Sequence, residues 1–120
     1  MDDATSRIIG AAIEVHRILG PGLLESVYEQ ALCCEFELCG IEYRRQVPLT
    51  IDYKGRSLTG QRLDLLVLQE VIVEIKSTRA LHENAVAQTL SYLKASGLRR
   101  ALLINFGEKR LADGIKRISL

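Results

Sequence analysis

Several features that would assign this 120-residue chain to a special class of protein are missing. No apolar run approaches the roughly 18 residues that a membrane-spanning helix needs. The acidic start Met1-Asp2-Asp3 lacks the basic residues of a signal peptide. There are no internal repeats, linkers or low-complexity segments. We therefore expect a single cytoplasmic domain over residues 1–120, and the 48% of hydrophobic residues is enough to build its core.

Cysteine is scarce and odd in number, which argues against a closed disulfide framework. The three cysteines, Cys33, Cys34 and Cys39, fall within one predicted helix. Their spacings do not fit one helical face at about 100° per residue, which disfavours a metal cluster made from them alone. We expect buried or half-buried free thiols.

A strong excess of charge of either sign is also lacking, because the formal net charge is only +1. The distribution is uneven, however. Residues 1–93 carry 9 Lys and Arg against 13 Asp and Glu, whereas residues 94–120 carry 7 against 2. The basic C-terminal segment could meet phosphates. A solvated helix end and strand rim explains the same charges equally well.

The hydrophobic periodicity predicts an α/β fold. Helices are expected at residues 3–19, 23–39 and 83–96. After residue 42 the period changes to two, which predicts strands at 42–47, 49–53, 57–68 and 71–77. An almost continuous apolar strand follows at 100–106, with a short edge strand near 114–120. This order predicts a mixed sheet flanked by helices, with a right-handed crossover through the third helix.

Two of these strands carry charges among apolar residues. Asp64 lies in the first, and Glu74 and Lys76 lie in the second. Charged side chains are seldom buried unless they are paired or bind a metal. Two adjacent carboxylates fit a hard divalent cation such as Mg²⁺, and Lys76 could then orient or deprotonate a water. A structural ion pair at a strand end is the alternative.

The length of the turn between these strands decides whether the charges meet. A two-residue turn, Gln69-Glu70, would place Asp64 opposite Ile75, on the wrong face. A three-residue turn, Leu68 to Glu70, sets Asp64 opposite Glu74. A site made of all three charges therefore requires an odd-length turn or a bulge.

Two helices contribute further candidates. Glu25 lies in line with the large apolar residues Tyr28, Leu32 and Phe36, rather than on a plainly wet face. Gln88 and Tyr92 share a face of the third helix, from which Gln88 could reach Lys76, a water or a phosphate. The alternatives are a solvated glutamine and a core tyrosine.

A family resemblance joins these pieces. The segment Gly22-Leu23-Leu24-Glu25-Ser26-Val27-Tyr28 has the pattern Gly-x-x-Glu-x-x-Tyr. The other pieces are Val15-His16, Leu19-Gly20-Pro21-Gly22, Arg62-x-Asp64, Glu74-Ile75-Lys76, Gln88-Thr89-Leu90-Ser91-Tyr92-Leu93 and Ile104-Asn105-Phe106-Gly107. In this order and spacing, over nearly the whole chain, they resemble the GxxExxY protein family, which is assigned to the PD-(D/E)XK nuclease superfamily.

The resemblance implies a restriction-endonuclease-like core of a helix, three antiparallel strands, a helix and a strand, which agrees with the element order α-α-β-β-β-β-α-β expected from the chain's own pattern. It implies that Asp64 and Glu74 hold Mg²⁺, or Mn²⁺ in its place, with the carbonyl of Ile75 as a further ligand. Lys76 would act on the attacking water, and Glu25 would help to hold or orient the metal. Gln88 and Tyr92 match a Gln-x-x-x-Tyr helix motif of exonuclease-like branches. His16 falls inside the family pattern, and a core histidine bonded to backbone is the expected reading.

The leading hypothesis is therefore a Mg²⁺-dependent nuclease that acts on nucleic acid, with DNA preferred. A homodimer is a further hypothesis, because dimerisation would enlarge the footprint of so small a nuclease. Candidate phosphate contacts, from charge and position only, are Arg44, Arg45, Arg79, Arg99 and Arg100. The second hypothesis is an accessory module with the same fold that binds nucleic acid or protein and hydrolyses little. A metal-dependent enzyme on a small phosphorylated substrate is a third.

Overall fold

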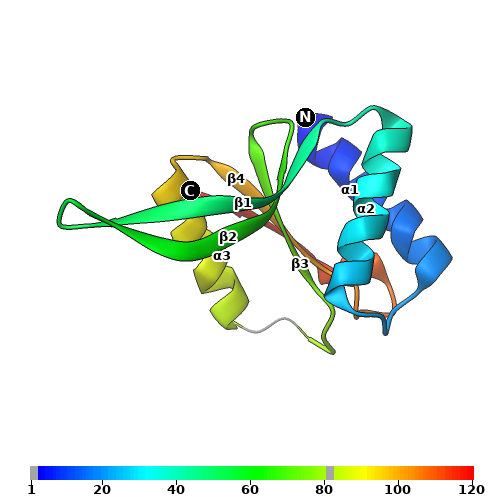
Figure 1. The fold of residues 1–120 in the computed structure, drawn as a ribbon. Helices are drawn as coiled ribbons and strands as arrows, with labels where there is room; N and C mark the ends of the chain where they lie inside the picture. The colour runs from blue at the N-terminus through cyan, green and yellow to red at the C-terminus, as the bar shows by residue number, and fades with distance from the viewer. Residues whose placement is uncertain (1–2, 81–82) are drawn as a thin grey trace.

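The computed structural model describes residues 3–80 and 83–120, which form a five-stranded sheet between two helical layers (Figure 1). Helices α1 (Asp3–Leu19) and α2 (Glu25–Cys39) lie on one side of the sheet, and α3 (Glu83–Ser96) lies on the other. The strands are β1 (Tyr43–Tyr53), β2 (Arg56–Val67), β3 (Val71–Lys76), β4 (Arg100–Asn105) and β5 (Ile115–Ser119), and the 3-10 helix η1 (Leu111–Gly114) precedes β5. None of the helices in the described residues is both long and apolar enough to cross a bilayer.

The expected mixed sheet is confirmed. The strands follow the order β1-β2-β3-β4-β5, and β3 and β4 are parallel while the other neighbours are antiparallel. One expectation is wrong, because residues 42–47 and 49–53 belong to a single strand, β1. Three strands therefore precede α3, instead of four. Pro48 does not end β1 because β1 is an edge strand, where a missing backbone donor is tolerated.

The core has two parts, one on each side of the sheet. On the side of α1 and α2 it contains Leu65 and Val67 of β2, and on the side of α3 it contains Leu63 of β2 and Leu49 of β1. Successive strand residues normally alternate between faces, so Leu63 and Leu65 should share one. The β1–β2 hairpin instead changes faces between them, where Gln46 of β1 has a positive φ of 49°.

The end of β3 is fastened to the end of β4. The backbone N–H of Phe106 donates to the carbonyl of Lys76 at 2.8 Å. The buried side chain of Asn105 accepts from the N–H of Thr78 and donates to the carbonyl of Thr78, both at 3.0 Å. Gly107 lies so close that a Cβ built on it would sit 2.0 Å from the oxygen of Thr78. The chain just after Lys76 therefore has a fixed course.

The start of α2 is fastened by Tyr28. Its hydroxyl donates to the carbonyl of Gly20 and accepts from the N–H of Leu23 at 3.1 Å. Its ring stacks on Phe106, with the ring centroids 4.6 Å apart. Tyr28 thus fixes the loop from which α2 and Glu25 begin, and it links that loop to the end of β4.

The close approach at Gly107 makes a stability prediction. We expect Gly107→Ala to lower the free energy of unfolding by at least about 2 kcal/mol, because the new methyl group can be accommodated only if the Thr78 backbone moves. Gly10→Ala is the matched control. Gly10 lies in α1 with open space around its Cβ position, and alanine there should stabilise by about 0.5–1 kcal/mol. Urea unfolding of both variants measures this, and equal effects would contradict the clamp.

Candidate functional site

The turn between β2 and β3 has the odd length that a joint site requires. Leu65 pairs with Val73, Leu66 with Ile72 and Val67 with Val71, so the turn is Leu68 to Glu70. The same register places Asp64 opposite Glu74. At this position the two strands separate, and the acids take over the hydrogen bonding. The carboxylate of Glu74 accepts from the N–H of Asp64 at 2.9 Å, and the carboxylate of Asp64 accepts from the N–H of Ile75 at 2.8 Å.

The backbone direction of β3 at this point exposes a third oxygen to the acids. The N–H and C=O of one strand residue point to the same side of the strand. Because the N–H of Ile75 points to Asp64 on β2, the carbonyl of Ile75 points toward β2 as well. The carbonyl of Lys76 points the other way and is bound by Phe106. Two carboxylates and the Ile75 carbonyl therefore lie between β2 and the C-terminal end of β3.

The two carboxylates are strained electrostatically. Glu74 is only 3% exposed. Burial, and next the negative charge of Asp64, raise its pKa to about 8. Burial also raises the pKa of Asp64, and the hydrogen bond from the Ile75 N–H opposes this increase only in part. A cation between the two acids would relieve both causes.

Lys76 lies close to the two acids but is not ion-paired with either of them in the described part of the chain. Its charge lowers the pKa of both Asp64 and Glu74. Within residues 3–80 and 83–120, however, no ion pair joins Lys76 to either acid. The strand-end ion pair considered as the alternative is therefore not formed, and the ammonium group remains available.

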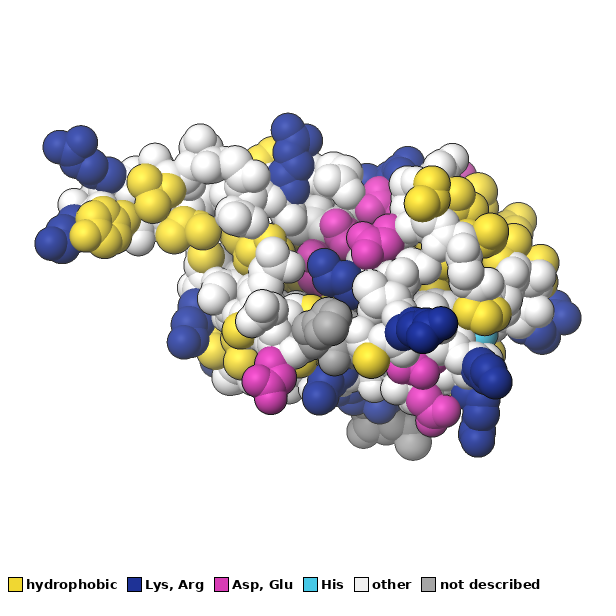
Figure 2. Space-filling view, turned by 90° about the horizontal axis from the view of Figure 1, so that it is seen from below, with side chains coloured by type: hydrophobic (Ala, Val, Ile, Leu, Met, Phe, Trp, Pro, Cys, Tyr) yellow, Lys and Arg dark blue, Asp and Glu magenta, His cyan; other side chains and the backbone are white. Residues whose placement is uncertain are grey.

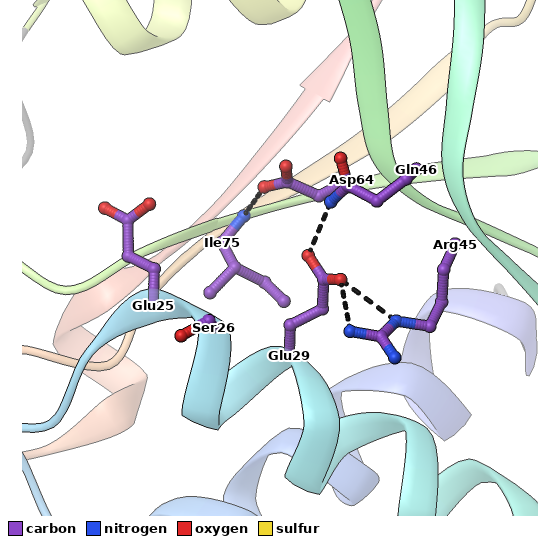
Figure 3. A pocket seen from close by; sticks show the side chains of 7 residues that line it. All are labelled: Glu25, Ser26, Glu29, Arg45, Gln46, Asp64 and Ile75. Atoms are coloured by element: carbon purple, nitrogen blue, oxygen red, sulfur yellow. Dashed lines mark hydrogen bonds and ion pairs between the residues drawn. The ribbon is translucent and has the colours of Figure 1, made fainter.

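The start of α2 lies against the end of β3. The hydroxyl of Ser77, directly after Lys76, donates to the carbonyl of Leu23 at 2.6 Å. Two residues after Leu23, the exposed side chain of Glu25 lines the same open pocket as Asp64 and Ile75 (Figure 3). The pocket has a volume of about 480 Å³, and its other lining residues are Ser26, Glu29, Arg45 and Gln46.

Glu29 is a pocket residue that sequence reasoning missed. It is buried, one helical turn after Glu25, and it accepts hydrogen bonds from Gln46 at 2.9 Å and from Arg45 at 3.0 Å (Figure 3). Its charge adds to the causes that raise the pKa of Asp64 and Glu74. The spacing of four between Glu25 and Glu29 was the available signal. Glu29 thus binds β1 at the position where the side chains of the β1–β2 hairpin change from one face of the sheet to the other.

The surface shows the same concentration of acid. Figure 2 shows Asp and Glu side chains gathered at the centre of one face, between the hairpin on one side and the helical part with α1 and α2 on the other. Lys and Arg side chains lie beside this acidic patch. An acidic centre with basic surroundings suits a cation that in turn meets an anionic ligand.

The two α3 candidates are placed differently. Tyr92 is buried, and its hydroxyl donates to Gln61 of β2 at 2.6 Å. Burial, and next the charges of Glu74 and Asp64, raise the pKa of Tyr92. Tyr92 packs with Ile72 in the core on the α3 side, and alternation along β3 puts Glu74 on the same face as Ile72. Gln88, one turn earlier on α3, is exposed. Tyr92 is thus a core residue behind the site, and Gln88 is at the surface.

The five arginines do not lie together. Arg45 lines the pocket but forms an ion pair with Glu29 at 2.9 Å. Arg44 and Arg79 are exposed, and Arg79 is three residues beyond Lys76. Arg99 and Arg100 are at the other end of the sheet, because Arg100 pairs with Val71 whereas Lys76 pairs with Asn105. That is about 16 Å along the strand, and Arg100 forms an ion pair with Glu70 there.

His16 and the cysteines are not part of the site. His16 is buried, and its Nε2 donates to the carbonyl of Glu108 at 2.8 Å, as expected of a core histidine. All three cysteines are free, and Cys33 is buried whereas Cys34 and Cys39 are exposed. Burial raises the pKa of the Cys33 thiol to about 11, so this thiol is unreactive at neutral pH.

The oxygen donors fit a hard divalent ion. In the described part of the chain, no three His, Cys, Asp or Glu side chains are grouped closely enough to hold a metal by themselves. An ion such as Mg²⁺ does not need such a cage, because it is bound by one or two carboxylates and keeps several waters. Asp64, Glu74 and the Ile75 carbonyl meet this requirement, and Glu25 is too far to complete a three-acid cluster.

Comparison with known proteins agrees with this geometry. The family model of the PD-(D/E)XK nuclease superfamily matches residues 2–118. The chain therefore belongs to the PD-(D/E)XK nuclease superfamily, whose nucleases generally use divalent metal ions. Comparison with curated proteins found no match, and comparison with solved structures found none either.

The raised pKa of Glu74 predicts how stability depends on pH when no metal is present. Between its ordinary value of 4.5 and about 8, the folded protein keeps a proton that the unfolded chain has lost. The free energy of unfolding should therefore fall as the pH rises through this window, by at most about 1.4 kcal/mol per pH unit from this group. Glu74→Gln should flatten the fall, and Asp64 would contribute what remains.

Urea unfolding between pH 5 and pH 8, with a chelator present, measures this dependence. Glu83→Gln is the control, because Glu83 is an exposed residue in the first turn of α3 and should leave the slope as in the wild type. A wild-type protein whose stability does not fall over this range would contradict the buried, repelled state of Glu74.

Proposed function

We propose that this protein is a Mg²⁺-dependent nuclease of the GxxExxY type that hydrolyses phosphodiester bonds of DNA. The observation that carries the proposal is the buried carboxylate of Glu74 beside the half-buried carboxylate of Asp64, next to the ammonium group of Lys76, which forms no ion pair within residues 3–80 and 83–120. Membership of a nuclease superfamily supports the reaction class. DNA as the substrate and Mg²⁺ as the ion go beyond the family and are part of the proposal.

Each proposed metal ligand has a supporting contact. Asp64 and Glu74 would each offer carboxylate oxygen, because the hydrogen bonds to Ile75 and Asp64 leave other lone pairs free. The Ile75 carbonyl would be the third ligand. Glu25, across the pocket, would act through a metal-bound water. When bound, the ion would supply positive charge at the scissile phosphate and lower the pKa of a water.

The remaining residues would act on the water and the phosphate. Lys76 would orient the attacking water or take its proton, and its positive charge would offset charge that develops on the phosphate oxygens. Gln88 is exposed on α3 and would hold the water or a phosphate oxygen, because Glu74 shares a face of β3 with Ile72, which packs in the core on the α3 side. Arg79 follows Lys76 by three residues in the chain, and Arg45 lines the pocket, so these two arginines are the proposed phosphate contacts.

Cleavage assays test the proposal. Lys76→Ala and Asp64→Asn should each lower the rate of DNA cleavage in Mg²⁺ or Mn²⁺ by about 100-fold or more, since each removes a group that acts at the reacting atoms. Lys76→Ala should leave the free energy of unfolding within about 0.5 kcal/mol of the wild type, because Lys76 forms no ion pair within residues 3–80 and 83–120. Lys94→Ala, an exposed change in the last turn of α3, should keep full activity.

Metal binding is measured separately from cleavage. Mg²⁺ should raise the melting temperature more at pH 8 than at pH 5, because the two carboxylates must be ionised to bind it. If Mg²⁺ binds and yet duplex, single-stranded and branched DNA and RNA all remain intact, the nuclease proposal fails. The accessory-module hypothesis would then take its place.

A further inference from the structure

The tip of the β1–β2 hairpin projects from the rest of the molecule. We call residues 51–58 the hairpin arm. The arm extends away from all three helices (Figure 1), and the molecule measures 46 × 30 × 27 Å along its principal axes. Its tip is a two-residue turn, Lys54-Gly55, in which both residues have positive φ. A projecting hairpin of this kind contributes little to the core and needs another explanation.

One face of the hairpin arm continues the face that α3 covers. Leu49 and Gln61 form a cross-strand pair on that face, where Leu49 packs in the α3 core and Gln61 accepts from Tyr92. Between this pair and the next, Ile51 with Leu58, β1 advances two residues and β2 advances three. The extra residue is a β-bulge at Gly60, whose φ is 111°. The bulge keeps the following pairs on the same face.

Beyond α3 this face is apolar and uncovered. Tyr53 and Leu58 keep 57% and 48% of their surface exposed. Arg56 is the cross-strand partner of Tyr53, and the Lys54 ammonium lies 5.5 Å from the centre of the Tyr53 ring. In the described residues neither Lys54 nor Arg56 forms an ion pair. The arm thus presents an aromatic ring with two available positive charges.

This combination fits a single-stranded nucleic acid. Proteins bind such strands by stacking bases on aromatic side chains while Lys and Arg track the phosphates. A duplex offers its phosphates but keeps its bases stacked inside, so the exposed side chains of Tyr53 and Leu58 would have no base to contact. Pairing of a second copy along the edge strand β1 is hindered by Pro48 and by the positive φ of Gln46.

The hairpin arm and the acidic patch face the same way. Figure 2 shows hydrophobic side chains along the projecting hairpin, Lys and Arg side chains at its tip, and the acidic patch, all on one face of the molecule. Tyr53 lies seven residues further along β1 than Gln46, which lines the pocket. That is about 23 Å, or about seven nucleotides at the duplex rise and fewer in a stretched strand.

We propose that the hairpin arm binds a single-stranded segment of the nucleic acid whose phosphodiester bond lies at Asp64, Glu74 and Lys76. Tyr53 stacks on a base, and Lys54 and Arg56 contact phosphates. The proposal rests on the proposed function and names the substrate of that site as a strand that is single-stranded on the side toward the arm.

Fluorescence anisotropy with labelled DNA tests the arm. All proteins carry Lys76→Ala so that the probe stays intact. For a single strand of about 15 nucleotides, Tyr53→Ala should weaken binding about tenfold, whereas Tyr53→Phe, which keeps the ring, should bind as the parent does. Lys54→Ala with Arg56→Ala should lower the slope of log affinity against log salt by about 1.4, for two lost phosphate contacts.

Two controls fix the location and the length. Lys116→Ala with Arg117→Ala removes two exposed positive charges from β5, at the opposite edge of the sheet, and should cost about twofold or less. The parent's affinity should also rise steeply between strands of about 5 and about 15 nucleotides, as the probe becomes long enough to join pocket and arm. Tyr53→Ala should show much less of this rise.

Several results would overturn the inference. Unchanged affinity in the arm variants would do so, as would an equal loss for duplex and single strand, or a parent protein that does not bind single strands at low salt. Loss of self-association at unchanged DNA affinity would assign the arm to a second copy instead. Anisotropy decides the role of the arm, while cleavage by the wild-type protein separately decides the nuclease proposal, so the two can fail independently.

Discussion

The structure depends on the exchange of hydrogen bonds between Asp64 and the Glu74–Ile75 segment at the point where β2 leaves β3. Each acid accepts from a backbone N–H near the other, so the N–H groups of Asp64 and Ile75 keep partners where the strands part. The arrangement nevertheless costs stability, because burial and the neighbouring charge of Asp64 disfavour the ionised form of Glu74. A core made only for stability would place apolar residues here. The cost is intelligible if a cation completes the site.

A second set of contacts, none of them catalytic, fixes where Lys76 and Glu25 can be. Asn105 and Gly107 hold Thr78, Phe106 binds the Lys76 carbonyl, and Tyr28 stacks on Phe106 while its hydroxyl closes the loop before α2. In the Gly-x-x-Glu-x-x-Tyr pattern the tyrosine therefore has a structural role, because it fixes the loop from which α2 and the acidic Glu25 begin. Asn105, Phe106 and Gly107 have a similar structural role at the end of β4, where they fix the chain just after Lys76.

The sequence supplied only a condition for the turn between β2 and β3, namely that a joint site needs an odd length or a bulge, and the three-residue turn is a finding of the structure. The sequence was sufficient for the helices and the mixed sheet, because the hydrophobic period depends on local alternation. It was not sufficient for β1. Pro48 signals a break in any strand, and only the position of β1 at the edge of the sheet makes it harmless. Glu29 was missed because its burial depends on Arg45 and Gln46 from a distant segment. Arg100 was grouped with the site by its charge and its position in the sequence, and neither shows that it lies at the opposite end of β4 from Asn105, the partner of Lys76.

The change of faces in the β1–β2 hairpin ties the pocket to the hairpin arm. Where Gln46 and Asp64 interrupt the alternation, the outer part of the hairpin turns toward α3 and the inner part stays against α2. Glu29 holds this position through Arg45 and Gln46. The same irregularity therefore opens the pocket around Asp64 and directs the exposed face of Tyr53. A regular ribbon would keep Asp64 paired with β1 and β3, and its tip would face the other way. Site and arm are consequences of one backbone irregularity, so neither can be altered there without altering the other.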